Sequence, residues 1–353
     1  MNRELFDLYT DYVLSSIFRR TATGLSDLLD GAISHDKVTR FLSREDYGSK
    51  ELWHHVKPFV RQAESEDGVL IFDDTIEEKP YTDESEAVCW CYDHTQQRNV
   101  KGINILTALV RYEEASFPVT YDIVKKTETY LDEKTGKEKR KSKQTKNEMF
   151  REMLCRCRKN HLKFKYVLAD SWFASKENME AVLQHEKHFV FAIKANRMVA
   201  LTEEAKQRGE FTAIRSLKLE KDQAVRVYLK GLEVPVLLVK QVFTNKDGST
   251  GELFLVCSDL SLEGPQMIEI YQKRWKIEEF HKSIKSNVGL EKSPTKTVRT
   301  QCNHIFACIC AYVKLESLSL KRHLNHFALK YKLVVKANQS AWLEFQIMKT
   351  ATT

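Results

Sequence analysis

The 353-residue chain has little glycine and proline, with 12 Gly and 6 Pro, and it lacks long apolar runs. Its composition of 42% hydrophobic and 30% charged residues excludes collagen-like and disordered chains. No apolar run approaches the roughly 18 residues that a membrane-spanning helix needs, so we expect no membrane partner. Charged residues interrupt the first twenty positions, unlike a secretory signal, and we therefore expect a cytoplasmic protein.

The eight cysteines lack the Cys-x-x-Cys spacing that forms half of many zinc sites. Cys-x-Cys pairs begin at Cys89, Cys155 and Cys308, and His304 stands one helical turn before Cys308. We expect buried, reduced thiols at these positions, because that is the usual state of cysteine in a cytoplasmic chain.

Negative charge is scarce in parts of the chain, although the net charge is only +7. Between Lys134 and Lys146, seven Lys or Arg stand against the single acid Glu138, and residues 299–353 contain eight Lys or Arg against two acids. This distribution suits a polyanionic partner such as nucleic acid. For the segment between Lys134 and Lys146, a solvated basic loop without a nucleic-acid partner is the alternative, because it has the same composition.

Apolar spacing predicts helices over residues 1–62, and residues 24–42 resemble a helix-turn-helix. Ser34 is expected to cap the second helix of this pair, which exposes Lys37 and Arg40. We interpret these two cations as DNA-contacting residues. A small helical bundle without DNA contacts has the same pattern.

From residue 67 the pattern changes to short apolar strands. Residues 69–73, 103–112 and 116–124 predict an antiparallel meander. Residues 165–170 predict a fourth strand, which returns through a helix and lies parallel to the first.

Two aspartates follow the first and fourth of these strands, Asp74 and Asp170. Parallel neighbours end at the same edge of a sheet, so the two carboxylates are expected to lie side by side. A single aspartate at a strand end is usually a turn residue, whereas two at matching positions predict a metal site.

A β-rich block at residues 208–257 precedes a long helix predicted over residues 266–287. At about 100° per residue, one stripe of this helix, roughly 60° wide, contains Tyr271, Arg274, Glu278 and Lys285. The neighbouring acid Glu279 falls outside the stripe, which favours Glu278 as a catalytic residue. A solvated basic face is the alternative, but it does not explain a single acid among these residues.

The spacing Y-x2-R-x3-E-x6-K of these four residues resembles the signature of DDE transposases from bacterial insertion sequences, of the insertion-sequence-4-like group. Asp74 in FDDT and Asp170 in VLADSWF resemble the first and second acids of that family, in the same order. Asp73 competes with Asp74, which is favoured because it directly precedes Thr75. The resemblance covers residues 67–312.

This resemblance implies an α/β fold with an RNase H-like mixed sheet flanked by helices. A β-rich insertion would precede the last catalytic helix, and a small helical domain would stand at the N-terminus. The expected division is a helical, DNA-binding segment 1–62, a first core part 63–200, a β-strand insertion 201–260, a last core part with the catalytic helix 261–335, and a tail 336–353.

The implied activity is cut-and-paste transposition, in which the enzyme binds the ends of an insertion sequence and catalyses metal-dependent strand cleavage and strand transfer. Asp74, Asp170 and Glu278 would hold two Mg²⁺ ions, with Mn²⁺ as a substitute. The expected partners are double-stranded DNA, both transposon ends and target, and a second copy of the chain in a synaptic complex in the bacterial nucleoid. Further DNA contacts are assigned to Tyr271, Arg274, Lys285, Lys282, Trp275, Lys125 and Lys126.

Two other classes of protein are alternatives to the transposase. Another RNase H-like nuclease, such as a junction resolvase, would lack the stripe of tyrosine, arginine, glutamate and lysine. A non-catalytic DNA-binding protein derived from a transposase would have no need of all three acids. The chain contains no tryptophan between Trp172 and Trp275, where hairpin-forming relatives hold a flipped base, so the excision route is not implied.

Overall fold

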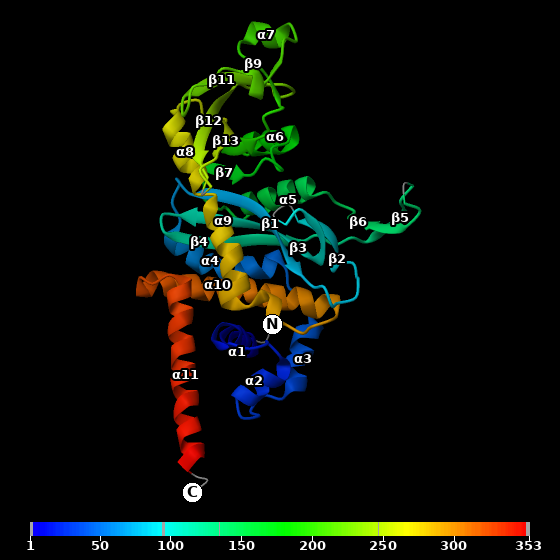
Figure 1. Ribbon diagram of the computed structural model, residues 1–353, viewed down its shortest axis with the longest axis vertical. Coiled ribbons are helices and arrows are strands. Elements are labelled where there is room, and N and C mark those ends of the chain that lie inside the picture. Colours follow the sequence, from blue (N-terminus) through cyan, green and yellow to red (C-terminus); the bar gives the residue numbers. More distant parts are fainter. Residues whose placement is uncertain (1–2, 94–95, 134, 246, 351–353) are drawn as a thin grey trace.

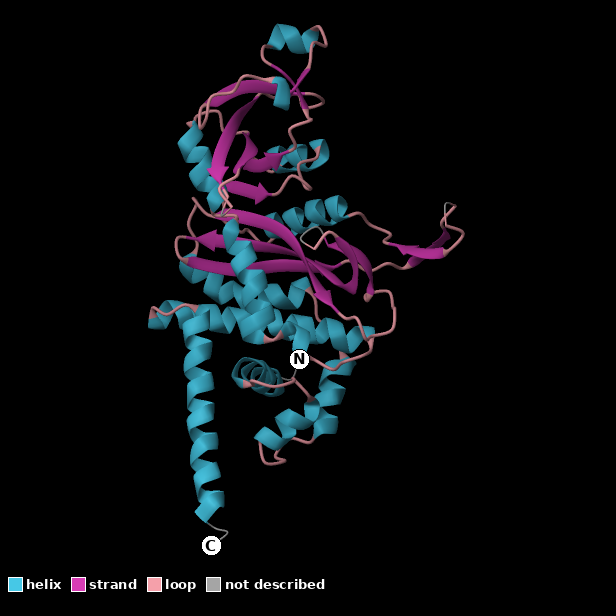
Figure 2. Cartoon of the chain, in the orientation of Figure 1, coloured by secondary structure: helices cyan, strands magenta, loops and turns pink. Residues whose placement is uncertain are grey.

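The computed structural model describes residues 3–93, 96–133, 135–245 and 247–350. Helices cover both faces of a large sheet (Figure 1 and Figure 2). The helices are α1 (Arg3–Ser15), α2 (Ala22–Leu28), α3 (His35–Arg44), α4 (Ser49–Ala63), α5 (Lys146–Lys159), α6 (Lys176–Gln184), α7 (Glu203–Gln207), α8 (Gly264–Gln272), α9 (Trp275–Ser283), α10 (Val298–Arg322) and α11 (His326–Thr350), with short turns η1 (Ile214–Ser216), η2 (Ile284–Val288) and η3 (Leu290–Lys292). The strands are β1 (Val69–Glu78), β2 (Cys89–Asp93), β3 (Arg98–Tyr112), β4 (Ala115–Ile123), β5 (Glu128–Leu131), β6 (Glu138–Lys141), β7 (Tyr166–Ala169), β8 (His188–Ile193), β9 (Met198–Ala200), β10 (Thr212–Ala213), β11 (Ala224–Leu229), β12 (Val236–Thr244) and β13 (Thr250–Cys257).

The centre of the sheet has the predicted strand arrangement. β1 pairs antiparallel with β3, and β3 pairs antiparallel with β4. β7 lies parallel to β1, and β8 lies parallel to β7. The predicted meander with a parallel fourth strand is therefore confirmed, and this mixed α/β arrangement is consistent with the expected RNase H-like fold.

The two faces of β1 pack against different helices, because successive side chains of a strand point to opposite sides. Val69 and Ile71 join the core on the side of α9 and α10. Leu70 and Phe72 join the core on the opposite side, where the Phe72 ring lies 4.2 Å from that of Phe150 in α5. The same alternation continues into the polar residues that follow.

The β-rich block extends this sheet from β8. β13 pairs antiparallel with β8, and the order continues through β12 and β11 to β9 and β10. The block is therefore continuous with the central strands through backbone hydrogen bonds. The basic segment at residues 134–146 contains strand β6, which pairs with β5 in a separate, exposed hairpin that projects from the body (Figure 1).

The N-terminal helices share a hydrophobic core with α10. Phe6 of α1 packs against Phe306 of α10, with 5.5 Å between ring centroids. The predicted helix pair is present as α2 and α3, and the Ser34 side chain accepts a hydrogen bond from the Lys37 backbone N–H, as expected for a cap. Residues 3–63 are thus built onto the C-terminal helices, far away in sequence.

One prediction about the C-terminal part needs correction. The helix predicted over residues 266–287 is interrupted between α8 and α9, where the N–H groups of Lys273 and Arg274 bond three residues back rather than four, and it ends in the π-helical turn η2. Within the predicted tail 336–353, the described residues belong to α11, which ends at Thr350.

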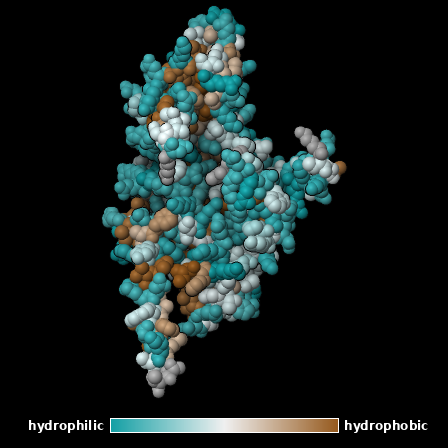
Figure 3. All heavy atoms as spheres, viewed as in Figure 1, coloured by the Kyte–Doolittle hydropathy of each residue, from teal (hydrophilic) through white to brown (hydrophobic). Residues whose placement is uncertain are grey.

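Helix α11 extends away from the rest of the molecule (Figure 1), and His326 is its only buried residue among those described. Apolar side chains gather around the place where α11 leaves the body (Figure 3). Along its length α11 exposes large apolar residues, among them Trp342, Phe345 and Ile347. Among the described residues no helix combines the length and the apolar character needed to cross a bilayer.

Candidate active site

A cleft of about 730 Å³ lies at the carboxyl ends of β7 and the neighbouring part of β1. Five acids line it: β1 supplies Asp73 and Asp74, β2 supplies Asp93, Asp170 directly follows β7, and α9 supplies Glu278. The parallel pairing of β1 and β7 brings Asp73 and Asp170 together, and α9 packs across β1. The middle of β1, the end of β7 and the helix thus meet at one cleft, although β1 continues past the predicted strand end to Glu78.

Asp73 faces α9, on the same side of β1 as Ile71. Its carboxylate lies 3.2 Å from Nη1 of Arg274, which is also 3.4 Å from Oε1 of Glu278. Burial, together with the negative charge of Glu278, raises the pKa of Asp73 to about 8, although Arg274 opposes this rise. Arg274 therefore sits as a cation between two carboxylates that repel each other.

Asp74, which the sequence favoured as the first acid, points to the opposite face of β1. There its carboxylate accepts hydrogen bonds from Nζ of Lys146 at 2.7 Å and from the side-chain amide of Asn104 at 2.7 Å. Both aspartates line the cleft, and Asp73 is the one whose carboxylate shares the Arg274 guanidinium with Glu278. The choice of Asp74 as the first acid rests on its family position directly before Thr75 and stays a prediction.

Asp170 also lies in the cleft, where burial raises the pKa of its carboxyl group. One of its oxygens accepts the backbone N–H of Trp172 at 2.9 Å, which holds the side chain at the end of β7. The charge of Arg274 lowers the pKa of Asp170, and the charge of Asp74 raises it. Asp170 therefore interacts electrostatically with charged residues on both faces of β1.

His281 is a residue of this site that the sequence analysis missed. A ring nitrogen of His281 and one carboxylate oxygen each of Asp73 and Glu278 lie within 4.8 Å of one another. The ring is buried, and burial lowers the pKa of His281 to about 3, with further lowering by Lys285 and Arg274. Its position on the helical wheel, about 20° from Arg274, was a usable signal.

Lys146 is the second missed residue. It is the first residue of α5, directly after the capping residue Thr145. Besides its ion pair with Asp74, its Nζ lies 5.9 Å from the ring centre of Trp172. The segment was recognised as basic, but nothing in the sequence singles out this lysine among its neighbours.

The cations predicted on the catalytic helix occupy different surroundings. Arg274, Lys282 and Lys285 line the cleft, and Nζ of Lys285 donates to the backbone oxygen of Ile76 at 2.7 Å. Tyr271 is buried, and its ring centre lies 5.8 Å from the Arg274 guanidinium carbon. Tyr271 therefore supports Arg274 and does not offer a surface to DNA in this conformation.

Trp275 is 64% exposed and lines a second, larger groove of about 1070 Å³. That groove lies between α9, the β3–β4 turn and the ends of α10 and α11, and it shares Glu278 with the acidic cleft. Trp275 is therefore close to the acids along the chain but turns toward the neighbouring groove.

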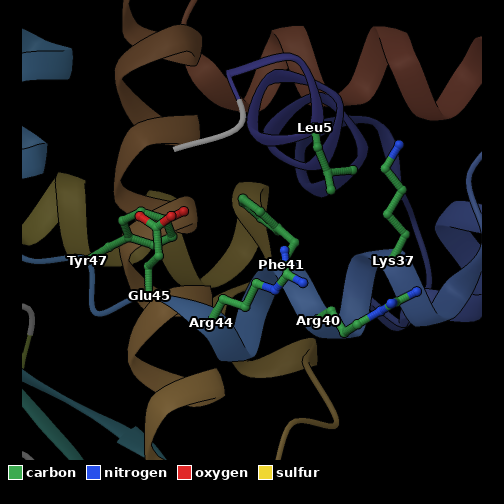
Figure 4. Close-up of a pocket in the computed structure, with 7 residues that line it drawn as sticks. All are labelled: Leu5, Lys37, Arg40, Phe41, Arg44, Glu45 and Tyr47. Atoms are coloured by element: carbon green, nitrogen blue, oxygen red, sulfur yellow. The ribbon is translucent and has the colours of Figure 1, made fainter.

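The remaining predicted DNA-contacting residues lie outside the cleft. Lys125 pairs with Glu86 at 3.0 Å, and Nζ of Lys126 donates to the backbone oxygen of Trp90 at 2.7 Å. Lys37 and Arg40 extend from α3 beside a small cavity of about 230 Å³, which Leu5 of α1 also lines (Figure 4).

Carboxylates that converge from two parallel strands and a helix, together with nearby cations, define a site suited to metal-assisted phosphoryl transfer. Two family comparisons agree with this class. The DDE superfamily endonuclease family matches residues 2–210, and the transposase DDE domain matches residues 135–314. The chain therefore belongs to the DDE superfamily of endonucleases and transposases. No curated protein matches the chain.

Proposed function

We propose that the protein is the transposase of a bacterial insertion sequence of the insertion-sequence-4-like group, which cuts DNA at the ends of its element and joins them to target DNA. The observation that carries this proposal is the convergence of Asp73, Asp170 and Glu278 in one cleft beside Arg274. We propose Asp73, in preference to Asp74, as the first acid of the set, because it lies on the face of β1 that receives α9 and its Glu278.

The residues present fit divalent metal ions. Carboxylate oxygens are the donors that Mg²⁺ and Mn²⁺ prefer, and the Arg274 guanidinium already stands as a cation between Asp73 and Glu278. We propose that Asp73, Asp170 and Glu278 hold two Mg²⁺ ions, for which Mn²⁺ can substitute. When bound, such a pair activates a water or 3′-hydroxyl nucleophile and stabilises the leaving oxygen.

Arg274 has two roles in this scheme. Without metal, Arg274 lowers the repulsion between Asp73 and Glu278. When these carboxylates hold metal ions, Arg274 is released toward the DNA. An arginine can bind two phosphate oxygens at once, so it would then orient the scissile phosphate. Tyr271 beneath the guanidinium restricts where Arg274 can move.

Lysines around the cleft extend the positive surface toward the DNA backbone. Lys282 is exposed and lines the cleft together with Lys285. On the opposite face of β1, Lys146 forms an ion pair with Asp74. Like Arg274, Lys146 would leave this ion pair and contact a DNA phosphate. These groups would hold phosphates on either side of the cleavage position, whereas Trp275 would contact DNA that enters the second groove.

More distant surfaces would bind the flanking and terminal parts of the element. We assign Lys37 and Arg40 on α3, and Lys125 and Lys126 after β4, to backbone contacts with double-stranded DNA. Transposition needs an active site at each of two ends, so we propose a homodimer in the synaptic complex. The exposed apolar residues of α11 support such pairing, and the substrate places the enzyme at the bacterial nucleoid.

The proposal is tested by strand cleavage of linear DNA that carries the element's end, with and without Mg²⁺. The variants Asp73→Asn, Asp170→Asn and Glu278→Gln should each abolish cleavage while DNA binding persists. Glu279→Gln is the matched control, because Glu279 is exposed and pairs with Lys276 at 2.8 Å instead of lining the cleft. Full activity in any of the three acid variants would contradict the assignment.

A further inference from the structure

His281 is an unusual neighbour for two catalytic carboxylates. Its ring lines the acidic cleft, and only 6% of the residue is exposed. Nε2 is buried and has no hydrogen-bond partner within the described residues. A buried polar atom without a partner is rare in folded proteins, and it calls for a specific explanation such as a ligand that is absent from the structure.

Packing alone does not explain the ring. Its aromatic contact is with the adjacent Phe280, at 5.4 Å between centroids and a tilt of 52°. A phenylalanine or leucine would fill such a place without leaving a polar atom unpaired. In another buried histidine, His304, the ring nitrogens lie 2.9 Å from the Tyr9 hydroxyl and 3.3 Å from the Cys308 sulfur. Nε2 of His55 is also unpaired, but the described residues place no pair of carboxylates around it.

The geometry is that of three ligands around one ion. Glu278 and His281 are one turn apart on α9, and Asp73 faces them from β1. Their donor atoms lie within 4.8 Å of one another. Ligands about 2.1 Å from an octahedral ion are separated by up to about 4.2 Å, so a small approach of the side chains closes the site. Within the described residues this is the one group of acids, histidines and cysteines with such a spacing.

We propose that His281 is a nitrogen ligand of one of the divalent ions in the cleft, so that this ion has mixed imidazole and carboxylate coordination. The inference rests on the proposed metal-dependent function and refines its ligand set. Imidazole favours transition metals over Mg²⁺, whereas carboxylates accept both. The ion between Asp73 and Glu278 is therefore expected to bind Mn²⁺ in preference to Mg²⁺, and the position at Asp170 is expected to discriminate less.

Electron spin echo spectroscopy of bound Mn²⁺ tests this directly, because it detects nitrogen in the first coordination sphere. The full chain is loaded with Mn²⁺, without DNA, after preparation with natural histidine or with ¹⁵N-labelled histidine. We expect a ¹⁴N modulation that changes to the ¹⁵N pattern on labelling. This comparison uses the wild-type chain and does not depend on the folding of a variant.

Variants then assign the signal to one residue. His281→Gln should remove the nitrogen modulation and weaken Mn²⁺ binding at least about 10-fold, with a smaller effect on Mg²⁺ binding. His188→Gln is the control, because His188 lies at the start of β8, whereas Asp170 follows the end of the neighbouring parallel strand. It should leave the spectrum unchanged.

The outcomes separate the inference from the function on which it rests. Mn²⁺ that binds in wild type and is lost in Asp73→Asn, but shows no histidine nitrogen, overturns the role of His281 and leaves the metal-dependent function intact. Mn²⁺ binding that is unaffected by both Asp73→Asn and Glu278→Gln overturns both.

Discussion

Replacing Asp73 by asparagine should stabilise the metal-free protein while it removes catalysis. The Asp73 carboxyl group loses its proton near its ordinary pKa of 3.8 in the unfolded chain, and at a pKa of about 8 in the folded protein. Between these values the folded state binds one proton more than the unfolded state. The corresponding stability is complete below about pH 3.8 and is lost as the pH rises through 8.

The magnitude follows from this interval. Each pH unit corresponds to about 1.36 kcal/mol, and about three units separate pH 5 from the folded pKa, so wild type loses up to about 4 kcal/mol between pH 5 and pH 9. Asparagine has no charge to bury beside Glu278 and escapes this loss. The free energy of unfolding of Asp73→Asn should therefore rise relative to wild type as the pH increases.

Guanidinium denaturation in EDTA at pH 5, 7 and 9 measures the difference. Asp74→Asn is the matched control, because its carboxylate faces Lys146 and Asn104 and its removal deletes favourable contacts. It should show no such gain. A difference between Asp73→Asn and wild type that is constant within about 0.5 kcal/mol from pH 5 to pH 9 would refute the reasoning about the acidic cleft.

Other parts of the molecule give further predictions. Gly264→Ala should destabilise the protein by at least about 1–3 kcal/mol in thermal or chemical denaturation, because the new Cβ would lie 1.9 Å from the backbone oxygen of Asp222. Gly48→Ala should be tolerated, since the nearest atom to its Cβ would be 3.9 Å away. Lys37→Gln and Arg40→Gln should each weaken DNA binding and reduce the slope of log affinity against log salt by about 1. An unchanged slope in both variants would exclude phosphate contacts by α3.

Local signals explain why much of the fold was predictable from the sequence. Helix starts such as Ser34 and Thr145 are set by hydrogen bonds within four residues, and the structure contains both caps. The strands of the meander have apolar runs of their own, and their order leaves few topologies. The arrangement around Asp170 followed from these local patterns.

Long-range packing explains what the sequence did not reveal. The choice between Asp73 and Asp74 depends on which face of β1 packs against α9. Alternation along the strand places the two aspartates on opposite faces, but it does not predict which face that is. The burial of Tyr271 similarly depends on how α8 and α9 pack. For α11, the apolar residues are spread around the helix, so the pattern does not identify a face or a partner.

Position on a helix also explains why His281 was missed although the information was present. It falls about 20° outside the polar stripe, next to Arg274, and a histidine in an amphipathic helix is usually a core or surface residue. Only the cleft, with its two carboxylates nearby, distinguishes it. The basic charge of the β5–β6 hairpin does not decide between a DNA contact and a solvated loop, because the hairpin is exposed in either case.

The central claim is that Asp73, Asp170 and Glu278 hold metal ions that act on a DNA phosphodiester. Its most direct test is cleavage of end DNA in which sulfur replaces the leaving 3′ oxygen. Mg²⁺ binds sulfur poorly and Mn²⁺ binds it better, so wild type should cut this DNA slowly in Mg²⁺ and recover in Mn²⁺. Glu278→Gln should show no recovery. Cleavage that proceeds in EDTA, or a sulfur effect that Mn²⁺ leaves unchanged, would contradict the account.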